Sequence, residues 1–124
     1  MIQIKRVYEP PAKTDGARFL VERLWPRGMK KAELKMDGWL KDIAPTDALR
    51  RWFNHDPAKW TEFQKRYRAE LRKHAVACQP LLATAKRGTV TLLYSAHDTE
   101  HNNAVVLRDI IEKAISRPQA REAA

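Results

Sequence analysis

Thr89-Val90-Thr91-Leu92-Leu93-Tyr94-Ser95-Ala96 is the stretch that decides the fold. A segment of this length, rich in β-branched and apolar residues, is typical of a strand that is buried in a sheet. Gly88 stands just before it and ends a helix predicted for about residues 80–86, because glycine often follows the last helical turn. The sequence therefore predicts a buried strand that follows a helix.

A polar loop and an amphipathic helix follow this strand. Residues 97–102 form the loop, and the helix is predicted to begin near Asn102 or Asn103. The apolar residues recur at helical spacing and are Val106, Leu107, Ile110, Ile111, Ala114 and Ile115. The polar, alanine-rich end of the chain, residues 118–124, is predicted to fray.

Two further strands are predicted before residue 30. Ile2 and Ile4 alternate with polar residues, and Glu9-Pro10-Pro11 ends this strand because proline donates no ladder hydrogen bond. Residues 18–25 combine β-branched and aromatic side chains at strand length and run into Pro26-Arg27-Gly28, a strong breaker.

The middle of the chain is predicted to be mainly helical. Residues 29–35 suit a helical turn, and residues 36–43 suit a third short strand. A short helix follows an N-cap at Thr46 or Asp47, and Asp56-Pro57 begins a longer one. The longer helix has an apolar face formed by Trp60, Phe63, Tyr67 and Leu71.

These elements predict an α/β fold in a single small domain. Strands that alternate with helices favour a mostly parallel sheet, here of about four strands, with helices packed on its faces. A chain of 124 residues suits one domain, predicted over residues 1–117, with residues 118–124 as the tail. In such folds ligands collect outside the carboxyl ends of the strands.

Composition restricts the function classes. No apolar run approaches the length of a membrane span, the N-terminus lacks a secretion signal, and Cys78 is the only cysteine, so we expect a cytoplasmic protein without membrane association. Cys78 is expected to be a small buried hydrophobe. The net charge of +9 attracts anions and leaves nucleic acid as a weaker candidate partner. Oligomeric state is left open.

Four ordered motifs resemble one bacterial family. They are Val21 to Gly28, Trp39 to Pro45, Phe53 to Pro57 and Leu92 to Leu107, and they are similar to the YeaO-like family, a domain of unknown function. That family usually has Asp where this chain has Glu22. A longer branch of the superfamily often has Cys-His-Arg after the histidine corresponding to His101, whereas this chain has Asn102-Asn103-Ala104. The resemblance therefore argues against chemistry based on a cysteine nucleophile.

Two polar loops at predicted strand ends carry the candidate site. Arg23 and Arg27 offer planar donor groups for a phosphate or carboxylate, and Trp25 can stack on a ring. Ser95, Asn102 and Asn103, with the first turn of the last helix, form the polar wall and can receive an anion. The structural alternative pairs Arg23 with Glu22 or Asp98 and places Trp25 in the core.

His101 and Asp98 are the candidate catalytic pair if the protein is an enzyme. An imidazole titrates near neutral pH, so His101 can carry a proton while Asp98 orients it. The alternative makes Asp98 and Asn102 turn or helix-capping residues and His101 a structural hydrogen-bonding group. His97 and His101 lie in a loop without an evident third ligand, so neither a metal nor another cofactor is predicted.

The leading prediction is a pocket for a small anionic or nucleotide-like ligand. The first alternative is a nucleic-acid-binding or regulatory module whose contact surface would be formed by Arg50, Arg51, Lys65, Arg66, Arg68, Arg72 and Lys73. The second alternative is a structural or partner-binding domain anchored by tryptophans such as Trp39.

Overall fold

The structure is a computed structural model that describes residues 1–116, so the predicted tail at residues 118–124 lies outside the described residues. The strands are β1 (Ile2–Arg6), β2 (Ala17–Leu20), β3 (Gly38–Trp39) and β4 (Val90–Tyr94). The α-helices are α1 (Asp47–Phe53), α2 (Trp60–Lys73), α3 (Ala75–Arg87) and α4 (Asn103–Ser116). Three short 3-10 helices are η1 (Lys13–Asp15), η2 (Lys41–Ile43) and η3 (Pro57–Lys59).

The four strands form one parallel sheet in the order β1-β4-β2-β3. Strand β4 pairs with both β1 and β2, and all of its residues are buried. This is the buried strand predicted from its run of β-branched and apolar residues. The predicted α/β fold with a mostly parallel, four-stranded sheet is confirmed.

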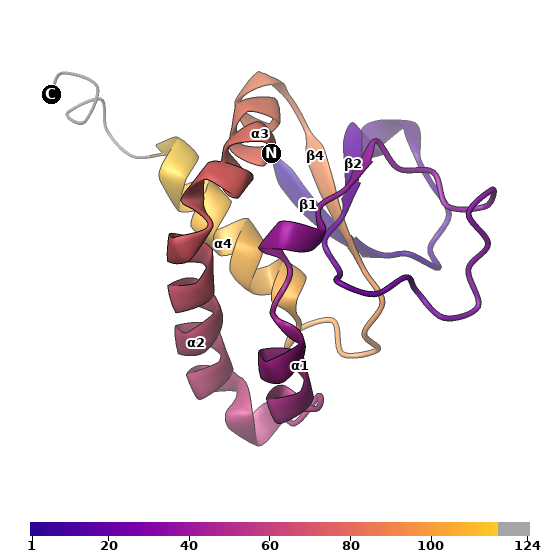
Figure 1. Cartoon of the computed structure of the whole chain (residues 1–124). Helices are drawn as coiled ribbons and strands as arrows, with labels where there is room; N and C mark the ends of the chain where they lie inside the picture. The colour runs from indigo at the N-terminus through magenta and orange to yellow at the C-terminus, as the bar shows by residue number, and fades with distance from the viewer. Residues whose placement is uncertain (117–124) are drawn as a thin grey trace, which may run out of the picture.

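The two faces of the sheet are covered differently (Figure 1). Helices α1 to α4 share one large core with Leu92 and Val90 of β4. On the opposite face, Leu20 and Leu93 pack with Leu34 and with partly buried Trp25, Met29, Met36 and Trp39, which come mostly from the connection between β2 and β3. The described helices therefore pack on one face, and a long loop covers the other.

Three predicted elements have different bounds in the structure. Strand β2 ends at Leu20 rather than near residue 25, because the Val21 N–H makes the last ladder-like bond, to the Leu93 carbonyl, before the chain turns away. Strand β3 has two residues instead of spanning 36–43, since η2 follows it directly. Helix α3 begins at Ala75 and contains Pro80.

Proline is tolerated inside α3 because the bond it removes lies at an exposed position. The missing N–H of Pro80 would have bonded the carbonyl four residues earlier, which belongs to Val76. Val76 is 78% exposed, so water can take the place of that donor. Residues before Pro80 can therefore join the helix, which the sequence prediction did not allow.

The connection before α2 is held by the predicted caps and by one buried tyrosine. The Thr46 hydroxyl accepts a hydrogen bond from the Leu49 N–H, and the Asp56 carboxylate accepts one from Ala58 N–H. The hydroxyl of buried Tyr67 donates to the Ile43 carbonyl at 2.5 Å. These bonds fix α1 and α2 beside the carboxyl ends of the strands. Within residues 1–116, no helix has both the length and the apolar character to cross a membrane.

Candidate functional site

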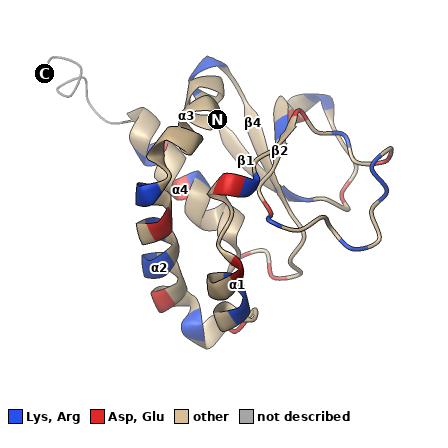
Figure 2. Ribbon diagram, viewed as in Figure 1, with Lys and Arg blue, Asp and Glu red and all other residues tan. Residues whose placement is uncertain are grey.

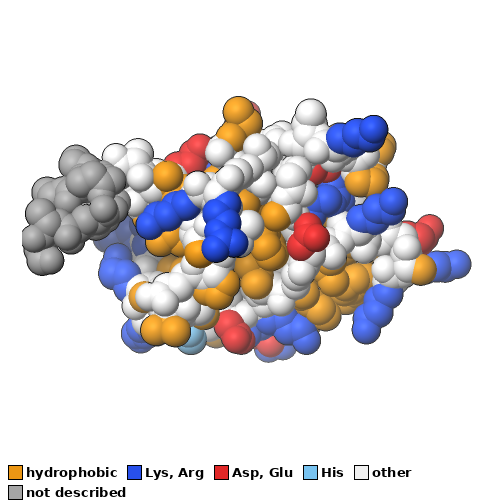
Figure 3. All heavy atoms as spheres, turned by 90° about the horizontal axis from the view of Figure 1, so that it is seen from above, with side chains coloured by type: hydrophobic (Ala, Val, Ile, Leu, Met, Phe, Trp, Pro, Cys, Tyr) orange, Lys and Arg blue, Asp and Glu red, His pale blue; other side chains and the backbone are white. Residues whose placement is uncertain are grey.

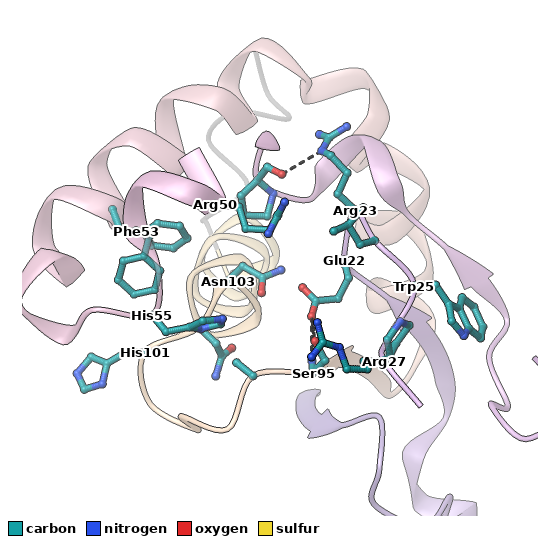
Figure 4. Close-up of a pocket in the computed structure, with 16 residues that line it drawn as sticks. Glu22, Arg23, Trp25, Arg27, Arg50, Phe53, His55, Ser95, His101 and Asn103 are labelled. Atoms are coloured by element: carbon teal, nitrogen blue, oxygen red, sulfur yellow. Dashed lines mark hydrogen bonds between the residues drawn. The ribbon is translucent and has the colours of Figure 1, made fainter. Parts of the chain in front are cut away.

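A cavity of about 240 Å³ opens at the carboxyl ends of β2 and β4 (Figure 4). Parallel strands bring their carboxyl ends to the same sheet edge, so the segments after β2 and β4 meet although they are distant in sequence. The cavity is lined by residues 22–27 after β2, by residues 95–96 and 101–103 after β4, and by residues of the α1 region together with Phe63 of α2. A cavity therefore lies at the strand ends where the pocket was predicted.

The structure brings the predicted site residues together with one exception. Those that line the cavity are Arg23, Trp25, Arg27, Ser95, His101, Asn102 and Asn103. Asp98 is not part of the lining. What these residues do in the cavity stays a prediction, but their contacts divide them into residues already engaged by the protein and residues available to a ligand.

Arg23 and Trp25 are engaged. The guanidinium of Arg23 donates to the carbonyls of Pro45 and Ala44, at 3.0 and 3.1 Å, and not to Glu22 or Asp98 (Figure 4). The indole N–H of Trp25 donates to the Met29 carbonyl, and its ring meets Trp39 edge-on with centroids 5.3 Å apart. Both side chains therefore hold neighbouring segments in place.

His101 stands at the edge of the cavity and is held from two sides. Its Nδ1 lies 2.9 Å from the Asp98 carboxylate, and its ring meets Trp60 edge-on with centroids 5.2 Å apart. Asp98 also accepts from the N–H groups of Glu100 and His101, as a turn-capping residue does. The hydrogen bond from Glu100, followed by the one from the His101 ring, holds the pKa of Asp98 below its ordinary value.

The first turn of α4 faces the cavity through two asparagines. Asn102 is the N-cap, because its side-chain oxygen accepts from the Val105 N–H, and Asn103 donates to the Val21 carbonyl at 2.5 Å. Within residues 1–116, no acceptor is bonded to the backbone N–H of Asn103 or Ala104. The positive end of the helix therefore keeps unpaired donors beside the cavity.

Glu22 is the acidic group of the cavity, although it was not among the predicted site residues and stood in the sequence as a possible partner for Arg23. One oxygen of its carboxylate, Oε1, accepts from both the N–H and the hydroxyl of Ser95, at 2.9 and 2.5 Å. Burial raises the pKa of Glu22, although the Ser95 bonds and the nearby His55 and Arg50 side chains oppose that rise. The sequence signal that could have identified Glu22 as a cavity residue was its position directly after the buried Val21, at a strand end.

Arg50 and His55 are cavity residues that the sequence analysis assigned elsewhere. The sequence placed Arg50 on a basic surface, and His55 was not among the predicted site residues. In the structure, Asn54 and His55 both have positive φ, 47° and 54°, which turns the chain sharply after α1 and leaves both residues exposed. This turn, which no pattern in the sequence specifies, brings His55 to the cavity.

Arg27 is the arginine of the cavity lining with the fewest partners. It is exposed, it lines the cavity, and no hydrogen bond or ion pair of its guanidinium occurs among the described residues. Arg50 differs, since it makes a 3.4 Å ion pair with Asp47 in which both side chains are largely exposed. Such an exposed pair is weak, so both guanidinium groups are available to an anion.

In the part of the chain that the structure describes, the potential metal ligands do not cluster and the cysteine lies away from the cavity. No group of three or more potential metal ligands occurs there, and Nδ1 of His97 lies near Arg6 instead of near His101. Cys78 lies in α3 outside the cavity lining, and burial raises the pKa of its thiol. A thiol with a raised pKa is a poor nucleophile.

The remaining basic residues are dispersed (Figures 2 and 3). Along α2, basic and acidic positions alternate in Figure 2, and Arg66 pairs with Glu62 while it lies over the Trp52 ring. On the face in Figure 3, other side chains separate the Lys and Arg groups. Nucleic-acid binding by the basic residues of α1 and α2 stays a prediction.

The comparisons with known proteins agree with the resemblance found in the motifs. Residues 1–124 match the family described as "Inactive DUF488-N3 subclade". The chain is 46% identical over 108 residues to "Uncharacterized protein YeaO" of Escherichia coli (strain K12), covering 87% of this chain and 94% of that protein.

More distant relatives come from mycobacteria. The chain is 34% identical over 110 residues to "Uncharacterized protein Rv3073c" of Mycobacterium tuberculosis (strain ATCC 25618 / H37Rv) and to "Uncharacterized protein Mb3100c" of Mycobacterium bovis (strain ATCC BAA-935 / AF2122/97), covering 89% of this chain and 92% of each relative. No solved structure matches. The chain belongs to the YeaO-like family, within the DUF488-N3i subclade.

Proposed function

We propose that this protein binds a small anionic molecule in the cavity at the carboxyl ends of β2 and β4. The observation that carries this proposal is the convergence on one cavity of Arg27, from the segment after β2, with Arg50 and His55, from the α1 region. Arginine is suited to phosphate and carboxylate because it presents a planar fork of donors. Each of the two arginines carries a positive charge that a bound anion can neutralise, and no ion pair within 4.0 Å joins either of them to Glu22, the acidic residue of the lining.

Two features add to the attraction of an anion. The first turn of α4 offers the unpaired N–H group of Asn103 on the side of the cavity. The net charge of +9 raises the local concentration of anions around the whole molecule. Arg23, the other arginine predicted to clamp the ligand, contributes mainly by holding the Ala44–Pro45 backbone in place.

The size and walls of the cavity favour a small molecule. Pockets for drug-sized ligands begin at about 300 Å³, and this cavity has about 240 Å³. Phe53 and Phe63, which stack with centroids 4.3 Å apart, supply an apolar wall. A phosphorylated or carboxylated metabolite of modest size suits this volume better than a polymer.

Binding, rather than catalysis, is the activity that we propose. The matched subclade is described as inactive, and the chain has Asn102-Asn103-Ala104 where a longer branch of the superfamily often carries Cys-His-Arg. A protein that recognises a ligand without transforming it fits these observations.

The test is a titration with inorganic phosphate in which calorimetry measures the affinity and thermal unfolding measures the stabilisation by the ligand. Arg27→Ala and Arg50→Ala should each weaken phosphate binding by about tenfold, as expected for loss of a charged hydrogen bond. Arg87→Ala is the matched control, because Arg87 is exposed and lies outside the cavity lining. Equal affinity in the wild type and all three variants would refute the site, and absence of phosphate binding by a folded wild type would refute the proposal for phosphate.

A further inference from the structure

One oxygen of the Glu22 carboxylate is available to a ligand. Both hydrogen bonds from Ser95 go to Oε1, and no described residue donates to Oε2. Among the described residues, every fully buried side-chain nitrogen or oxygen has a partner, so Oε2 cannot be sealed inside the protein. Glu22 lines the cavity, so the cavity is the space from which a ligand can reach Oε2.

The position of this oxygen is fixed by the fold. Glu22 follows β2 and Ser95 follows β4, so their two bonds tie the carboxylate to the sheet edge. In the view of Figure 4 the carboxylate lies between His55 and Asn103 on one side and Trp25 on the other. A ligand in the cavity therefore meets a preorganised acceptor.

The charges around the cavity are of both signs. Arg27 and Arg50 are cationic, Glu22 is anionic when ionised, and no ion pair within 4.0 Å joins Glu22 to a described basic residue. An ionised carboxylate only accepts hydrogen bonds, so it repels an anion that has no donor. A ligand with an acid at one end and a donor at the other satisfies both parts of the cavity.

We infer that the ligand is a small zwitterion, with a phosphate or carboxylate bound by Arg27 and Arg50 and a protonated amine bound by Oε2 of Glu22. This inference rests on the proposed function, because it takes the anion site from it. Glu22 is then the group that determines specificity. A molecule that lacks the amine leaves the carboxylate without a partner and is rejected.

Glu22→Gln offers a nearly isosteric test of this role. The glutamine oxygen can still accept from Ser95, but the amide NH₂ then stands where Oε2 was, so a cavity-facing acceptor becomes a donor. The shape of the cavity is kept while its ability to accept from an amine is lost. Glu100→Gln is the matched control, since Glu100 is exposed and does not line the cavity.

The probes are two matched pairs that differ by an amine. They are O-phosphoethanolamine with ethyl phosphate, and β-alanine with propionate. For the wild type and Glu100→Gln, calorimetry should give about tenfold or greater preference for the amine-bearing member of at least one pair, and that pair identifies the acid. The more positive ligand is disfavoured by the net charge of the protein, so long-range attraction cannot produce this preference.

Glu22→Gln should remove the preference while ethyl phosphate or propionate still binds. Persistence of the preference in Glu22→Gln, or equal binding of both members by the wild type, overturns the inference and leaves the anion site standing. Failure of all four probes to bind the folded wild type overturns the anion site itself.

A second measurement does not depend on the variant. Carbon-detected NMR can follow the Glu22 carboxyl in the wild-type protein during a pH titration. Bound O-phosphoethanolamine should lower the pKa of Glu22 relative to bound ethyl phosphate, because a nearby ammonium favours the ionised carboxylate. The same pKa with both ligands would contradict the inference.

Discussion

Glu22 and Ser95, which are 73 positions apart in the chain, are joined by two hydrogen bonds that end on one carboxylate oxygen. Each residue follows a strand of the sheet, Glu22 after β2 and Ser95 after β4. The pair therefore connects the two loops that form most of the cavity, and it leaves the other carboxylate oxygen accessible. The first two predictions concern this pair.

Ser95→Ala should lower the free energy of unfolding by about 1–2 kcal/mol, because it removes a hydrogen bond from a hydroxyl to a half-buried carboxylate. The backbone bond from residue 95 remains. Urea denaturation at neutral pH measures the change. Ser116→Ala, at the exposed end of α4, is the control and should change stability little. An equal effect of both substitutions would show that the 2.5 Å bond contributes nothing.

The stability of the wild type relative to Glu22→Gln should depend on pH. Burial raises the folded-state pKa of Glu22 above its ordinary value of 4.5, so the folded protein favours the protonated form. The resulting stabilisation is full below the unfolded-state pKa and is lost as pH rises through the folded-state pKa. The glutamine of Glu22→Gln does not titrate. As pH rises from about 4, near the ordinary carboxyl pKa, to about 7, the free energy of unfolding of the variant should therefore increase relative to that of the wild type. Denaturation at a series of pH values in this range measures the difference. A difference that is constant with pH would contradict this prediction.

Asn103→Ala should destabilise the protein by about 1–3 kcal/mol, because the Val21 carbonyl would lose the only hydrogen bond that the described residues give it. Asn103→Asp should not restore stability, since an ionised carboxylate cannot donate to a carbonyl. Thermal unfolding of both variants measures the effect. A fully stable Asn103→Asp protein would indicate that another donor reaches Val21.

Asp15→Asn should destabilise the protein by roughly 3 kcal/mol or more at neutral pH, because Asp15 is buried with Arg18 and also pairs with Lys5. Burial alone would raise the pKa of Asp15, but the hydrogen bonds from Ala12, Lys5 and Arg18 prevail and lower it. The stabilisation from the ionised group is therefore present above the ordinary pKa of 3.8 and is lost as pH falls through the lower folded-state value. Acid titration of both proteins should show their stabilities converging.

His101→Ala should lower the free energy of unfolding by about 1–2 kcal/mol, because the ring bonds Asp98 and packs against Trp60. Phosphate affinity should change little, since the proposed anion contacts are Arg27 and Arg50. Thermal unfolding with and without phosphate measures both effects. Unchanged stability together with lost phosphate binding would instead make His101 a ligand-binding residue.

The sequence by itself determined the fold class and the region of the cavity. The run of β-branched and apolar residues from Val90 to Tyr94 predicts burial on both faces, and the alternation of strands with helices predicts a parallel sheet. Parallel strands bring their carboxyl ends to one edge, so the loops after β2 and β4 could be predicted to meet. These are local patterns combined with a general rule of topology.

Only the tertiary structure decided which side chains are available in that cavity. Arg23 looks like an anion clamp in the sequence, but its donors go to the carbonyls of Ala44 and Pro45. His55 reaches the cavity through two consecutive residues with positive φ, and Glu22 acquires its accessible oxygen from the geometry of its bonds to Ser95. Periodicity records which residues are apolar at which spacing, whereas the partner of a polar side chain depends on contacts between segments far apart in the chain.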